Sequence, residues 1–227
     1  MTVPRTIDAV VFDCDGLLVE TESGWTRAET AVFAENGFAF GPAEKRLLLG
    51  GTLESGGAKM AGLFGQPASA GPALAARLAE LTWKELRAGA PALPGARDLV
   101  GLLGDRGIPV AVASNSSRRL VEVALRSAGL EDLFEVVVTA DDVDHGKPAP
   151  DLYLLACQGL GADPAHSVAF EDSPTGVASA RAGGLFVVGV PSVPGTTLGA
   201  DALYGSLADP DLRAWAAACT SPASAHQ

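Results

Sequence analysis

From about residue 93 to residue 190 the sequence alternates between short apolar stretches and amphipathic ones, and this alternation constrains the fold most. The apolar stretches predict strands over residues 108–113, 135–139, 167–170 and 185–190. The stretches beside them predict helices over residues 96–105, 118–128, 150–158, 175–182 and 211–218. Strands that alternate with helices form parallel sheets with right-handed crossovers. We therefore expect an α/β fold with a doubly wound parallel sheet.

A further strand is predicted near the N-terminus, over residues 7–12, where an apolar run carries a single charge. The run ends in Asp13, Cys14, Asp15 and Gly16. Side chains alternate along a strand, so the two aspartates share a side. Two close carboxylates repel each other unless a cation or a shared proton intervenes. Mg²⁺, with substrate phosphate completing its coordination, is the usual solution, although an aspartate pair before glycine also fits a plain polar turn.

Helical segments alone are predicted between this strand and the alternating region, from about residue 25 to residue 87. We divide the chain into a Rossmann-like core, residues 1–19 and 90–227, and an all-helical insertion, residues 20–89. The insertion leaves the sheet at the carboxyl end of a strand, where such sheets bind ligands. We expect it to act as a cap that excludes water; the alternative is a helical subdomain that only enlarges the core. Residues 221–227 are expected to fray.

The composition excludes several classes of protein. Hydrophobic residues make up 48% and charged residues 19%, which argues against disorder. The net charge of -11 argues against a nucleic-acid partner. Neither a signal peptide nor an apolar run long enough for a membrane span is found in the sequence. Cys14, Cys157 and Cys219 are odd in number and lack metal-ligand spacing, which predicts reduced thiols in a cytoplasmic protein. Nothing in the sequence indicates an oligomeric state.

Polar residues also follow the predicted strand 108–113, where Ser114, Asn115, Ser116 and Ser117 lead into a helix. Amides at a helix start, with a hydroxyl beside them, form a site for anions. We assign Ser114, at the strand tip, and Asn115 to phosphate binding. An ordinary helix cap by Ser116 or Ser117 is an equally good interpretation of those two residues.

Two more chemical groups lie at strand ends or in tight loops. Lys147 is held between Gly146 and Pro148, so its ammonium could sit beside a carboxylate and a phosphoryl oxygen. Most isolated lysines are solvated surface charges. The predicted strand 167–170 ends in Glu171 and Asp172, a second acidic pair that could hold a metal together with the first. A helix cap would explain one of these two acids but not both.

Together and in this order, these motifs resemble the haloacid dehalogenase superfamily, in particular its capped phosphatases and β-phosphoglucomutase-like proteins. The matching segments are FDCDGLLVET (residues 12–21), ASNSS (113–117), GKPAPD (146–151) and FEDSPTGVASARAGG (170–184). The resemblance covers nearly the whole chain, cap included.

The resemblance implies a role for each matching residue. Asp13 would be the nucleophile that becomes an aspartyl-phosphate, and Asp15 would protonate the leaving group and then activate water. Ser114 and Lys147 would steady the transferring phosphoryl group. The implied cofactor is Mg²⁺, held by Asp13, the backbone carbonyl of Asp15, and Asp172, with Glu171 close by.

The resemblance also favours one reaction. Dehalogenases and phosphonate-cleaving members of the superfamily lack the second aspartate of the segment that matches residues 12–21. This chain has Asp15 at that position, which argues for phosphoryl transfer. The related mutases carry a cap histidine and a cap arginine, where this chain has Trp25 and Leu53. We therefore expect hydrolysis of a small phosphorylated metabolite such as a sugar phosphate. A basic residue in the cap pocket would instead favour a mutase, and a non-catalytic binding protein is the third alternative.

Substrate choice should rest with the cap, because the core motifs handle only the phosphoryl group. The side chains expected to face the site from the cap are Thr21, Glu22, Trp25, Thr52 and Lys84. For each of them, ordinary packing or surface exposure is the competing interpretation.

Overall fold

A computed structural model describes residues 2–192 and 195–221 of the chain. Within these residues a six-stranded parallel sheet has the order β3-β2-β1-β4-β5-β6. The strands are β1 Ala9–Phe12, β2 Val110–Ala113, β3 Val136–Val138, β4 Ser167–Glu171, β5 Phe186–Gly189 and β6 Ala202–Leu203. Five of them were predicted to within two residues at each end. β6 was missed, because two residues at a sheet edge are too short to show a pattern.

The register of the sheet brings three strand ends to one place. Phe12, the last residue of β1, lies opposite Val112 of β2 and Phe170 of β4. All four residues of β1 are buried, as expected of a central parallel strand covered on both faces. The rings of Phe12 and Phe170 stack at 5.0 Å between centroids, which fixes the two strands side by side. The residues that follow β1, β2 and β4 therefore meet at the carboxyl edge of the sheet.

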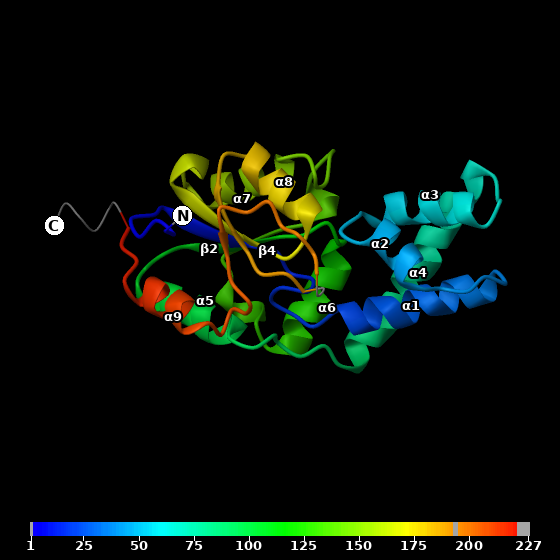
Figure 1. Cartoon of the computed structure of the whole chain (residues 1–227), viewed down its shortest axis with the longest axis horizontal. Coiled ribbons are helices and arrows are strands. Elements are labelled where there is room, and N and C mark those ends of the chain that lie inside the picture. Colours follow the sequence, from blue (N-terminus) through cyan, green and yellow to red (C-terminus); the bar gives the residue numbers. More distant parts are fainter. Residues whose placement is uncertain (1, 193–194, 222–227) are drawn as a thin grey trace.

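Helices cover both faces of the sheet, which confirms the doubly wound fold (Figure 1). On one face lie α5 Ala96–Asp105, α6 Arg118–Ala128 and α9 Pro210–Ala217; on the other lie α7 Asp151–Leu160 and α8 Pro174–Ala182. α5 and α6 have the predicted bounds, and the other three differ by at most two residues. Short 3-10 turns are found at Ala68–Ala70, Glu131–Leu133, Ala140–Asp142 and Pro164–His166. The expected frayed end, from residue 222 onward, lies outside the described residues.

Residues 20–89, all of which the structure describes, contain helices but no strand. These helices are α1 Glu22–Glu35, α2 Pro42–Leu48, α3 Leu53–Leu63 and α4 Gly71–Ala88, and they lie together beside the sheet (Figure 1). They have an apolar core of their own, around Phe33 and Met60. The Gly71-Pro72 pair forms the first turn of α4, because proline fits that turn without losing a hydrogen bond.

Two further features bear on the class of protein. Among the described helices, none combines the length and the apolar character that crossing a bilayer requires. Cys14, Cys157 and Cys219 are buried free thiols.

Candidate active site

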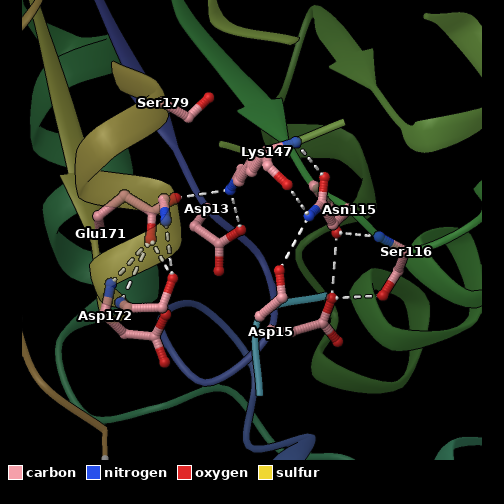
Figure 2. Close-up of polar contacts among 12 residues, drawn as sticks. Asp13, Asp15, Asn115, Ser116, Lys147, Glu171, Asp172 and Ser179 are labelled. Atoms are coloured by element: carbon pink, nitrogen blue, oxygen red, sulfur yellow. Dashed lines mark hydrogen bonds and ion pairs between the residues drawn. The ribbon is translucent and has the colours of Figure 1, made fainter. Parts of the chain in front are cut away.

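A buried ion-pair cluster lies at the carboxyl edge of the sheet, where β1 and β4 end. Lys147 Nζ contacts Asp13 Oδ1 at 2.5 Å and Glu171 Oε1 at 2.6 Å (Figure 2). The lysine and both carboxylates are buried. Burial alone would lower the pKa of Lys147, but the two carboxylates outweigh it and raise that pKa. Lys147 is therefore a fixed cation, not the solvated surface charge of the competing interpretation.

Glu171 is held by more partners than the sequence indicated. Its carboxylate accepts hydrogen bonds from the Tyr153 hydroxyl at 2.6 Å and the Ser173 hydroxyl at 3.2 Å, besides the backbone N–H of Asp172. A Cβ on Gly176 would lie only 1.8 Å from Glu171 Oε1, so this helix start must be glycine. The residues around Glu171 thus fix the carboxylate that orients Lys147.

Three carboxylates in this cluster could hold a metal. Ligand oxygens of Asp13, Glu171 and Asp172 all lie within 4.8 Å of one another. Desolvation, aided by neighbouring acids, raises the pKa of Asp13 to about 8 and that of Asp172 well above its usual range. One lysine cannot balance three buried carboxylates, and hard oxygen donors suit Mg²⁺. The donor set therefore fits the expected ion.

The loop after β1 must pass close to this cluster. Gly16 has φ +77°, a conformation that favours glycine, and a Cβ there would lie 2.6 Å from Asp172 Oδ2. The same oxygen of Asp172 accepts a hydrogen bond from the Ser192 hydroxyl at 2.5 Å. Ser192 follows β5 and was not identified from the sequence.

The Asp15 carboxylate has partners different from those of Asp13. Its Oδ2 accepts hydrogen bonds from Ser114 Oγ at 3.1 Å and Ser116 Oγ at 2.8 Å. Its Oδ1 accepts from Trp25 Nε1 at 3.3 Å, and Trp25 belongs to α1. The two aspartates therefore have different partners: Asp13 contacts a cation, and Asp15 accepts hydrogen bonds from neutral donors (Figure 2).

The turn after β2 serves a different purpose from an ordinary helix cap. Ser117 occupies the N-cap position of α6, but its side chain makes no capping hydrogen bond. Ser116, for which capping was an equally good interpretation, instead binds Asp15. The Asn115 amide donates to the carbonyls of Gly50 and Lys147, and its oxygen accepts from the Lys147 N–H. The Asn115 side chain thus braces the Lys147 loop against the loop between α2 and α3.

A cleft with about 700 Å³ of empty space, part of it open to solvent, separates this cluster from the helical insertion. Glu22, Trp25 and Thr52 line it, as predicted. Two predictions are wrong: Thr21 is fully buried outside the lining, and Lys84 pairs with Glu80 on an exposed side of α4. The lining also includes two charged residues that sequence reasoning missed, Glu29 and Lys45. Glu22, Trp25 and Glu29 are spaced as residues on one face of a helix are, so Glu29 could have been identified from the sequence.

Several known proteins are similar to this chain in sequence and in fold. A family model described as haloacid dehalogenase-like hydrolase matches residues 7–184. Protein CbbY of Rhodobacter capsulatus is 37% identical over 199 residues, which cover 82% of this chain and 86% of that protein. Hexitol phosphatase B of Escherichia coli is 34% identical over 201 residues, 85% of this chain and 87% of that one. A crystal structure of mutant CbbY from Rhodobacter sphaeroides, in complex with xylulose-(1,5)bisphosphate, superposes with a TM-score of 0.79 at 29% identity, covering 90% and 96% of the two chains.

Proposed function

Since the chain belongs to the haloacid dehalogenase-like hydrolases, we propose that it is a Mg²⁺-dependent phosphatase that hydrolyses a small phosphomonoester, such as a sugar phosphate. The observation that carries the proposal is the buried cluster in which Asp13 contacts Lys147 beside two further carboxylates. A nucleophilic carboxylate, a fixed cation and a metal-ligand set at one strand edge are the parts that phosphoryl transfer needs.

In the first step, an Asp13 oxygen attacks the phosphorus and the bond to the leaving oxygen breaks, which gives an aspartyl-phosphate. Lys147 offsets the charge of the transferring group and is kept in place by Glu171. The Ser114 hydroxyl and the backbone N–H of Asn115 are proposed to bind the phosphoryl oxygens, since the Asn115 side chain is already engaged.

Asp15 serves both steps as the proton carrier. It gives its proton to the leaving oxygen in the first step, and in the second it takes a proton from the water that attacks phosphorus. The bond to Asp13 then breaks and releases phosphate. Trp25 and Ser116 orient the Asp15 carboxylate throughout, and Ser114 does so until its hydroxyl turns to the phosphoryl group.

The proposed metal ligands are Asp13, Asp172 and the backbone carbonyl of Asp15, with Glu171 beside them. A bound Mg²⁺ would lessen the repulsion between the anionic nucleophile and the anionic phosphoryl group. We also propose that residues 20–89 act as the cap over the core of residues 1–19 and 90–227, and that the protein is cytoplasmic, which its three reduced thiols favour.

A phosphomutase, or a phosphatase for a bisphosphate, is the second candidate. Lys45 supplies the basic residue in the cap wall that this alternative needs, and a relative was crystallised with a bisphosphate. Lys45 is paired with Glu22 and Glu29, however, so its charge is already balanced. Hydrolysis of a monophosphate therefore stays the first candidate.

Removing the metal tests the proposal directly. Phosphate release from a panel of small phosphomonoesters is expected to fall by roughly 100-fold or more with excess chelator, and to return with Mg²⁺. Mg²⁺ should also raise the Tm, because a ligand that binds only the folded state stabilises it. Asp172→Asn should abolish most of that rise, whereas Asp98→Asn, at an exposed site away from the cleft, should not. Chelator-resistant phosphate release would contradict the proposal.

Trp25→Phe tests the contact between the cap and Asp15. The change removes the indole N–H and keeps an aromatic ring, so one hydrogen bond to Asp15 is lost. We expect kcat to fall by roughly tenfold for alkyl phosphates, with little change in KM. The loss should be smaller for p-nitrophenyl phosphate, whose leaving group needs little protonation. Equal losses on both substrates would indicate a packing role for Trp25 instead.

A further inference from the structure

The cap wall of the cleft carries a compact group of three charged side chains, Glu22 and Glu29 on α1 and Lys45 on α2. Lys45 Nζ lies 3.0 Å from Glu22 Oε2 and 3.0 Å from Glu29 Oε2. The two glutamates are seven positions apart, so they lie two turns apart on one face of α1 and hold the lysine between them. We call these three residues the cap triad. All three line the same cleft as Asp13 and Lys147.

The cap triad is partly desolvated and carries a net negative charge. Burial raises the pKa of Glu29, although Lys45 opposes this rise. Burial would lower the pKa of Lys45, but the two carboxylates outweigh burial and raise that pKa. Lys45 therefore stays protonated, and two carboxylates face one ammonium. Such a wall offers hydrogen-bond acceptors and donors side by side, and no excess positive charge.

The cap triad lies where the rest of a substrate must go. Asp13, Lys147 and Asp172 line the floor of the cleft and would hold the phosphoryl group, which leaves the cap wall for the leaving group. Glu22 of the cap triad and Asp172 of the floor line this one cleft.

We propose that the cap triad is the leaving-group receptor and that it selects a neutral polyhydroxy leaving group over one that carries a second phosphate. The proposal rests on the phosphatase function proposed above. A hydroxyl donates one hydrogen bond and accepts others, so a polyol can use the carboxylates and the ammonium together. A second phosphate would bring further negative charge against a wall that is already negative. Lys45 is thus a specificity residue for hydroxyl groups, not a bisphosphate clamp.

Lys45→Met tests the receptor role. We expect the ratio of kcat/KM for sorbitol 6-phosphate to kcat/KM for p-nitrophenyl phosphate to fall by roughly tenfold or more, since an aryl leaving group makes no such hydrogen bonds. A ratio measured on one sample does not depend on the fraction of active protein. Lys84→Met, which removes a lysine on an exposed side of the cap, is the matched control and should leave the ratio as it is. An unchanged ratio in Lys45→Met would overturn the proposal.

The double variant Glu22→Gln/Glu29→Gln tests the exclusion of a second phosphate. It keeps the shape of the wall but leaves Lys45 unbalanced, so the net charge of the cap triad becomes positive. We expect kcat/KM for fructose 1,6-bisphosphate to rise by roughly tenfold relative to that for sorbitol 6-phosphate. Glu35→Gln, at the exposed end of α1, is the control and should not change this ratio.

The outcomes separate this proposal from the function on which it rests. If the wild-type protein releases no phosphate from p-nitrophenyl phosphate or from any sugar phosphate, the phosphatase function itself fails. If it hydrolyses these compounds but prefers fructose 1,6-bisphosphate to sorbitol 6-phosphate, only the selectivity of the cap triad fails. A preference for phosphoethanolamine over glycerol 3-phosphate would also overturn the selectivity proposed for the cap triad, because the cap wall would then be a receptor for a cation.

Discussion

Asp13→Asn is expected to lower phosphate release by roughly 10⁴-fold or more while the protein stays folded. The substitution keeps the size and shape of the side chain but removes the oxygen nucleophile. It also weakens the contact with Lys147, which lies 2.5 Å from Asp13 Oδ1. Because Asp13 is buried and its ionised form is costly there, a neutral amide should not unfold the site.

The measurement is kcat on p-nitrophenyl phosphate and on a sugar phosphate, with circular dichroism and Tm to establish folding. Asp8→Asn is the matched control, because Asp8 lies just before β1 at the opposite end of the same strand, where it accepts a hydrogen bond from Asp163 N–H. It should retain nearly full activity. Appreciable turnover by Asp13→Asn, in protein whose intact mass excludes deamidation, would rule out Asp13 as the nucleophile.

Lys147→Met is expected to affect both activity and stability. The ammonium balances Asp13 and Glu171 in a buried site, so its loss leaves carboxylates without a counter-charge. Breaking a buried ion pair by removing one partner costs roughly 3 kcal/mol or more of stability. Activity should fall by roughly 10³-fold, because the transferring phosphoryl group also loses a fixed cation.

Urea unfolding monitors the stability change, and Mg²⁺ separates the two effects. We expect the metal to raise the Tm of Lys147→Met more than that of the wild type, since the ion then supplies the missing counter-charge. Lys59→Met, which removes an exposed lysine of the cap, should change neither quantity appreciably. Wild-type stability in Lys147→Met would mean that the carboxylates are balanced in another way.

The sequence was sufficient for the fold because its main signals are local. The buried run of β1 and the amphipathic patterns of α5 and α6 depend on neighbours a few positions away, and their bounds were predicted closely. The prediction missed β6, whose two residues pair with the edge of β5. So short a strand is specified by the sheet beside it and not by its own pattern.

The candidate site divides in the same way. Asp13, Asp15, Lys147, Glu171 and Asp172 could be picked out by sequence because each adjoins a strand end or a fixed loop. Their pairing could not: Lys147 meets Asp13 across 134 positions, and its loop is held in place by the Asn115 side chain, which binds the backbone of Lys147. Tyr153 and Ser192, which hold Glu171 and Asp172, give no signal before the helices and loops are in place.

The cap shows this limit most clearly. Lys84 and Lys45 are both lysines on cap helices, and sequence reasoning chose the first as a residue that faces the site. The structure turns Lys84 toward Glu80 one turn away and brings Lys45 between Glu22 and Glu29 in the cleft. Local patterns thus determined the fold class and the candidate residues of the site. The tertiary structure alone decided which charges meet, because electrostatic pairing depends on distances in space that helix packing and strand register set.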